Sequence, residues 1–284
     1  AAYMSANAFA EYAKVWNDKH DFKALAGYNF ERSVGKISDL LRYGLITNTA
    51  ESINLALGEN FTSYATESRW RSVGVFARIN YSYDNKYLIE LNGRYDGSSK
   101  FPTNQQWGFF PSVSAAWRVS GERWWNVNPN ILSSLKIRGS WGELGNANVG
   151  VYSFIETFNI DNLSYVIDGV SKPRITSIPS QIPDGLTWET SRTIDGGIDV
   201  GFYNGKINLT ADYYVRNTLD MYTVGPTLPD TYGASAPKGN YADLVTRGFE
   251  LSLSYDDSFK LGAHNLNVGF KATLADNRSC ITRD

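Results

Sequence analysis

The sequence has little of what most soluble enzymes use for chemistry: one cysteine, two methionines and two histidines among 284 residues. Cys280 has no partner within the chain, which excludes an internal disulfide framework and a metal site built from several cysteines. No segment approaches the run of about 18 apolar residues that a transmembrane helix needs. The formal net charge is -2, so the chain lacks the basic surplus typical of proteins that bind nucleic-acid phosphates.

Aromatic residues, in contrast, are abundant. They make up 14% of the chain, with 18 tyrosines and 8 tryptophans, and the mean hydropathy is -0.33. A membrane β-barrel has this composition, because only alternate residues of each strand face lipid and aromatic side chains gather at both interfaces. The modest hydropathy is therefore compatible with a membrane protein that crosses by strands.

Strict period-two alternation is the strongest pattern in the sequence. Between residues 73 and 83, Val73, Ile79 and Tyr83 occupy one face of an expected strand, while Arg78 and Asn80 occupy the other. Helical spacing fits none of the segments with this pattern. The alternation predicts an all-β fold with about ten antiparallel strands, at residues 5–16, 21–32, 70–83, 87–96, 108–119, 135–142, 190–203, 206–217, 247–256 and 264–276.

Strand length and connection length both favour a transmembrane barrel wall. Most predicted strands have the length of a tilted membrane-crossing strand, about 9–11 residues, or exceed it. Short connections, such as 84–86 and 204–205, alternate with long ones at 33–69, 143–189 and 218–246, apart from a near-tie around residue 120. Outer-membrane barrels show this alternation of short periplasmic turns and long extracellular loops. A soluble β-sandwich is the less favoured alternative.

A closed barrel turns its apolar face to lipid, since backbone groups in hydrocarbon must be paired and charged groups are costly there. The alternation then assigns mixed charges to a hydrated or plugged lumen. The predicted lumen-facing residues are Arg78, Glu90, Arg94, Asp96, Arg118, Lys136, Arg138, Asp199, Asp212, Arg216, Glu250 and Lys271.

Catalytic, cofactor and metal motifs are missing from the sequence. His20 and His264 lie at or beside predicted turns, with no nucleophile or carboxylate in a triad pattern and no metal-ligand spacing. We therefore expect no enzymatic activity and no cofactor. Long loops are uncommon unless functional, so their aromatic residues are candidates for contact with substrate or a lid: Trp107, Tyr152, Phe154, Phe158 and Tyr165. The alternative is that these aromatic side chains pack the loops onto each other.

Several long stretches resemble the SusC/RagA family of TonB-linked outer-membrane transporters. They are YSYDNKYLIELNGRYDGSSKFP at residues 81–102, WGFFPSVSAAWRVS at 107–120, LKIRGSWGELGN at 135–146, LTWE at 186–189 and TRGFELSLSY at 246–255. AGYNFE at residues 26–31 resembles an earlier strand of the same family. The matches are ordered along nearly the whole chain.

The resemblance implies a 22-stranded barrel whose lumen is filled by an N-terminal plug domain. It also implies TonB-driven import of glycan fragments or peptides, with a SusD-like surface lipoprotein as a lid. We find no plug or TonB-contacting segment, so we expect residues 1–284 to form a partial TonB-dependent receptor barrel, about half of the wall. Two alternatives remain at this stage: a plugless porin or adhesin, and a secreted carbohydrate-binding β-domain.

Overall fold

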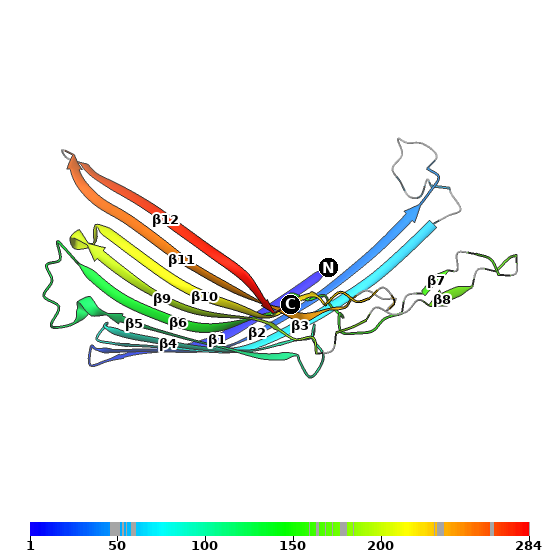
Figure 1. Cartoon of the computed structure of the whole chain (residues 1–284), viewed down its shortest axis with the longest axis horizontal. Coiled ribbons are helices and arrows are strands. Elements are labelled where there is room, and N and C mark those ends of the chain that lie inside the picture. The colour runs from blue at the N-terminus through cyan, green and yellow to red at the C-terminus, as the bar shows by residue number, and fades with distance from the viewer. Residues whose placement is uncertain are drawn as a thin grey trace.

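The chain forms one curved, single-layer antiparallel sheet of ten strands (Figure 1). This computed structural model describes residues 1–283 except 46–51, 53, 55, 58–60, 159, 163–164, 168, 172, 177–180, 184, 230, 232–235 and 262–263. Sequential strands are neighbours throughout, in the order β1-β2-β3-β4-β5-β6-β9-β10-β11-β12. In the described part of the chain, no helix has the length and apolarity needed to cross a bilayer.

All ten predicted strands are confirmed, most of them longer than expected. They are β1 (Ala2–Trp16), β2 (His20–Arg42), β3 (Phe61–Tyr83), β4 (Tyr87–Ser98), β5 (Trp107–Arg118), β6 (Ser134–Asn146), β9 (Glu189–Phe202), β10 (Ile207–Val224), β11 (Lys238–Leu261) and β12 (His264–Arg283).

The expected long connection at residues 33–69 is wrong in its extent. Strands β2 and β3 remain paired, from the His20–Tyr83 pair as far as the Arg42–Phe61 pair. The alternation of apolar residues fades along this extension, although the backbone ladder continues. A small hairpin, β7 (Ile160–Asn162) with β8 (Arg174–Thr176), also lies within the expected loop at 143–189.

The two rims of the sheet differ in their connections. We call one the short-turn rim, with connections at 17–19, 84–86, 119–133 and 203–206, and the other the long-loop rim, with connections at 43–60, 99–106, 147–188 and 225–237. The connection between β11 and β12 lies outside the described residues. Positive φ values at Asn17 (51°) and Asp18 (51°), and at Asp84 (51°) and Asn85 (56°), suit tight hairpin turns. The alternation fails at 119–133, which is longer than 99–106 on the other rim.

Aromatic side chains line the short-turn rim and hold the 119–133 connection against it. Ring centroids are 6.4 Å apart between Tyr83 and Tyr87, 6.4 Å between Tyr87 and Trp117, and 6.5 Å between Trp117 and Trp124. Glu122 Oε1 accepts hydrogen bonds from the Tyr87 hydroxyl (2.6 Å) and from Trp117 Nε1 (3.0 Å). These two donors, the tyrosine first, hold the pKa of Glu122 below its ordinary value.

A small buried core lies at the long-loop rim. It consists of Phe101, Phe110, Val149, Leu186 and Trp188, with Phe101 and Leu186 fully buried. The Trp188 indole also donates to the Gln106 carbonyl at 3.0 Å. These contacts attach the 147–188 connection to β5 and to the 99–106 connection, because removing apolar side chains from water stabilises the packed arrangement.

The faces of β3 can be tested by spin labels placed in turn at each position from 73 to 83 of the full-length protein, with Cys280 changed to serine. We expect lipid-soluble oxygen to reach labels at odd positions and a water-soluble nickel relaxant to reach those at even positions, since successive side chains alternate. Electron paramagnetic resonance in liposomes measures both. Uniform accessibility along the strand would contradict the assignment of faces.

The bond network of Glu122 predicts a pH dependence of stability. Because the folded-state pKa is lowered, its contribution is present above the ordinary glutamate pKa and is lost as pH falls through the folded-state value. We expect wild type to resist urea better than Glu122→Gln at pH 7, with the difference vanishing near the acid limit of folding. Tryptophan fluorescence reports the midpoints. A difference independent of pH would contradict an ionic role.

Candidate functional site

Register divides the sheet into two chemically distinct faces. Asn80, Glu90 and Ser114 are directly paired across β3, β4 and β5 and mark what we call the polar face. The row beside it, Tyr81, Ile89 and Ala115, marks the apolar face. Paired residues share a face, so following the register from strand to strand assigns every other position.

All eight charged residues selected from the sequence share the polar face: Arg78, Glu90, Arg94, Asp96, Arg118, Arg138, Asp212 and Arg216. Lys136, Asp199, Glu250 and Lys271 join them there. The structure thus places these predicted residues together on one surface. That surface is the lining of a lumen only once the sheet closes, so their lumen-facing role stays a prediction.

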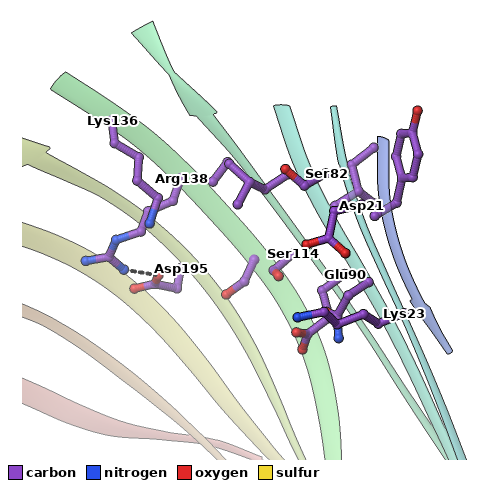
Figure 2. Close-up of a pocket in the computed structure, with 14 residues that line it drawn as sticks. Asp21, Lys23, Ser82, Glu90, Ser114, Lys136, Arg138 and Asp195 are labelled. Atoms are coloured by element: carbon purple, nitrogen blue, oxygen red, sulfur yellow. Dashed lines mark ion pairs between the residues drawn. The ribbon is translucent and has the colours of Figure 1, made fainter. Parts of the chain in front are cut away.

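A hollow of about 530 Å³ lies on the polar face (Figure 2). Lys136, Arg138 and Asp195 approach it from β6 and β9, and Asp21, Lys23 and Glu90 approach it from β2 and β4. Ser114 of β5 lies between these two groups of charges, and Ser82 of β3 lies beside Asp21; both add a hydroxyl group to the lining. The lining therefore offers donors and acceptors of both signs to whatever occupies the hollow.

Arg138 is the centre of the charge network beside this hollow. Its guanidinium lies 2.6 Å from Asp212 Oδ2, 3.4 Å from Asp199 Oδ2 and 3.7 Å from Asp195 Oδ1. Lys136 adds a second contact to Asp199 at 3.5 Å. Three carboxylates therefore share two cations. A charge-assisted hydrogen bond joins Arg138 of β6 to Asp212 of β10, and longer ion pairs join β6 to Asp195 and Asp199 of β9.

A glycine makes room for this network. Gly197 lies between Arg138 and Asp212 in the same cross-strand row. A Cβ atom at position 197 would collide with Asp212 Oδ1 and would lie 2.9 Å from Arg138 Cζ. The neighbouring Gly196, on the apolar face, would meet nothing within 4 Å. Position 197 thus has no room for a larger side chain, whereas position 196 has open space for one.

Several other charged residues of the polar face form local pairs. Arg94 bonds Asp96 through two nitrogens, at 2.9 Å and 3.1 Å, and its guanidinium carbon lies 5.3 Å from the Phe76 ring centroid. Arg78 donates to Asn92 Oδ1 at 2.6 Å. Arg216 lies over the Tyr214 ring at 5.5 Å. Such pairs keep long cationic side chains extended along the face.

The loop candidates separate into different environments. Trp107 is the first residue of β5, on the apolar face, where its ring stacks on Tyr95 at 5.0 Å; it is therefore a strand residue and not a loop residue. Phe154 packs against the buried core of the long-loop rim. The Tyr152 hydroxyl accepts a hydrogen bond from the backbone N–H of Arg69 at 3.0 Å. Phe158 and Tyr165 are each 64% exposed.

Asp21, Lys23 and Asp195 line the hollow, and sequence reasoning did not select them. Asp195 stands at an alternate position of β9 with Thr193, Gly197 and Asp199, so its face was available from the alternation. The proximity of Asp195 to Arg138 could not be predicted from the alternation, because the two residues come from different strands. In the described residues no cluster of histidine, cysteine and carboxylate side chains has the geometry of a metal site.

Comparisons with known proteins agree with this architecture. A family model described as TonB dependent receptor-like, beta-barrel, matches residues 2–280. TonB-dependent receptor P39 of Formosa agariphila is 30% identical over 248 residues, which are 87% of this chain and 23% of that protein. SusC of Bacteroides thetaiotaomicron is 32% identical over 194 residues, 68% of this chain and 19% of that protein.

A solved structure extends the comparison to the backbone. The RagAB peptide importer in its closed-closed state superposes with a TM-score of 0.83 at 25% identity, covering 99% of this chain and 30% of that chain. The chain spans about a quarter of the length of the curated relatives it matches, 23% of each of the first two. The fold described above is therefore that of one part of these larger barrels.

The paired glycines of β9 give a controlled test of the charge network. We expect Gly197→Ala to lower the free energy of unfolding by about 1–3 kcal/mol, because the new methyl group must displace Asp212 or Arg138. The matched variant Gly196→Ala adds the same atom in open space and should change stability by less than about 0.5 kcal/mol. Urea titration of the full-length protein in detergent measures both. Equal effects would show that the network does not need the glycine.

Proposed function

This chain belongs to the family of TonB-dependent receptor β-barrels, and we propose that it forms part of the wall of an active nutrient importer. It is an outer-membrane protein by its family and its relatives. The polar face, with its charged hollow, is the observation that supports import through a filled lumen. The proposed role of this segment is to contact the plug domain that fills the lumen and to present its loops to the substrate.

The apolar face supports contact with membrane lipid. Large apolar side chains on it are exposed, including Phe109 at 59%, Tyr213 at 56%, Ile194 at 54% and Val75 at 52%. Soluble proteins rarely leave so extended an apolar surface uncovered. Lipid tails would remove these side chains from water, while aromatic residues at the short-turn rim would lie at the headgroup level.

The polar face supports a plug domain in the lumen. Asp21 Oδ1 and Asp212 Oδ1 are buried without a hydrogen-bond partner in the described residues, and Asp21 borders the hollow. Buried carboxylate oxygens normally have partners, which bound water would supply. In this proposal the eight predicted charges of this face, Arg78 and Arg216 among them, contact the plug or the water around it.

The edges of the sheet support a larger barrel. Strands β1 and β12 each pair with one neighbour in the described structure, and their residues are exposed along the whole strand. In hydrocarbon every backbone donor and acceptor must be paired. We therefore infer that both edges join further strands, and that residues 1–284 are a partial barrel domain, as the sequence predicted.

The substrate class and the partners of this chain are proposed by analogy with its relatives. The RagAB structure is that of a peptide importer, and SusC is a TonB-dependent receptor. By analogy we propose import of glycan fragments or peptides, energised through TonB, with a SusD-like lipoprotein over the long-loop rim. The exposed Phe158 and Tyr165 are the proposed contacts for substrate or lid, and the relatives give no support for an enzymatic role.

Uptake assays distinguish an importer from a plugless porin. We expect cells that lack the full-length gene to lose uptake of at least one member of a panel of labelled oligosaccharides and oligopeptides, and complementation to restore it. A protonophore should stop this uptake while surface binding persists, because energy reaches the barrel through TonB. Uptake that continues at collapsed proton-motive force would favour a passive pore instead. A matched strain that lacks an unrelated porin controls for general permeability.

A further inference from the structure

Four basic side chains gather on the apolar face of β2 and β3, toward the long-loop rim. We call this group, Arg32, Lys36, Arg69 and Arg71 together with Glu67, the basic patch. The cross-strand register runs Phe30 with Val73, then Arg32 with Arg71, Val34 with Arg69, and Lys36 with Glu67. The patch therefore begins in the row that directly follows the last apolar row.

The position of the patch along the strands matches a membrane interface. On this face β2 carries only apolar side chains from Phe22 to Phe30, paired with Tyr81 to Val73 on β3. That stretch has the length of about 9–11 residues that a tilted strand needs to cross hydrocarbon. Arg32 and Arg71 then stand at headgroup level, on the rim with long connections, which faces the cell exterior in outer-membrane barrels.

Within the described residues, the positive charges of the patch outnumber the negative charge that pairs with them. Glu67 contacts Arg69 at 2.5 Å and Lys36 at 3.7 Å, and it is the one carboxylate of the patch. Within the described residues neither Arg32 nor Arg71 forms an ion pair through its guanidinium, and both residues are exposed. On the other side of Arg32, the same row continues to Met4 of β1, which is apolar.

Two arginines directly opposite each other in a sheet repel and destabilise the pair. An anion bound between the two guanidinium groups attracts both of them, and this attraction outweighs their mutual repulsion. A guanidinium binds two phosphate oxygens through its planar fork of donors, so two guanidiniums across a strand pair suit one phosphate group. Arg69 lies one row further out and Lys36 two rows further out, where they add favourable charge.

We propose that the basic patch binds the phosphate of an anionic lipid headgroup in the outer leaflet. This rests on the proposed function only for the assignment of the apolar face to lipid. Arg32 and Arg71 hold the phosphate, and the lipid's acyl chains lie along Phe30, Tyr28 and Val75 below it. The Tyr152 hydroxyl, bonded to the Arg69 backbone at 3.0 Å, fixes the 147–188 connection beside the headgroup.

A second arginine pair, Arg247 opposite Arg278, lies on the apolar face of β11 and β12. Asp276 precedes it on the same face, opposite Phe249, so a carboxylate stands between that pair and the apolar residues. The β2–β3 patch has no acidic side chain in the corresponding row. The lipid site is therefore assigned to Arg32 and Arg71.

The test uses the full-length protein purified in maltoside detergent and titrated with diphosphoryl lipid A, with thermal unfolding and native mass spectrometry as readouts. We expect wild type to retain the lipid and to gain in unfolding midpoint. The double variant Arg32→Gln/Arg71→Gln should bind about tenfold more weakly or worse. Without lipid its midpoint should be unchanged or higher, because the repulsion is gone.

The matched control is Lys14→Gln/Lys19→Gln, which removes two positive charges at the short-turn rim and should bind like wild type. The variant Arg32→Lys/Arg71→Lys keeps both positive charges but loses the planar guanidinium, so it should bind the lipid with intermediate affinity. This variant keeps the site testable if the glutamine variant fails to fold. The site would be overturned if the glutamine variant bound diphosphoryl lipid A as tightly as wild type, or if the lysine-to-glutamine control lost as much affinity. It would also be overturned if wild type bound dephosphorylated lipid A equally well. Inorganic phosphate that competes at equal affinity would overturn the lipid assignment. Because no outcome depends on transport, failure here is separable from failure of the importer proposal.

Discussion

The backbone hydrogen-bond ladder between neighbouring strands is the constraint on which the rest of this structure depends. In the part of the chain that the structure describes, the sheet is a single layer with no second layer of helices or strands on either face (Figure 1). Cohesion comes from the paired N–H and C=O groups, and each face must suit a different surrounding. That requirement produces the period-two sequence: apolar side chains where lipid lies, and charged side chains where water or a filling domain lies.

The two rims complete this wall by different means. At the short-turn rim, Glu122 accepts bonds from Tyr87 and Trp117 and holds a fifteen-residue connection, 119–133, against aromatic rings. At the long-loop rim, Phe101 and Leu186 are fully buried in a small core made almost entirely by connections. A wall one layer thick thus has its few buried side chains outside the membrane-crossing region, where connections can fold over one another.

The polar face needs space as well as charge. Gly197 leaves room for the Arg138–Asp212 bond, and Gly74 leaves room for Asp96, whose carboxylate a Cβ at position 74 would meet. The same face thus alternates long ionic side chains with glycines in the paired strand. On the apolar face Arg32 and Arg71 stand opposite each other, and neither guanidinium forms an ion pair with a described residue. We assign the role of counter-charge to a lipid phosphate.

Local sequence patterns were enough to predict the all-β class, the ten strands, the separation of apolar from charged residues and the tight turns, because alternation and turn chemistry are local properties. It also assigned Arg78, Arg138 and Asp212 to one face. Three contacts became known only from the folded chain: Arg138 bonds Asp212, 74 residues later, Leu186 packs near Phe101, and Arg32 faces Arg71. Cross-strand register sets those contacts, and register depends on pairing between distant segments, which no local pattern records.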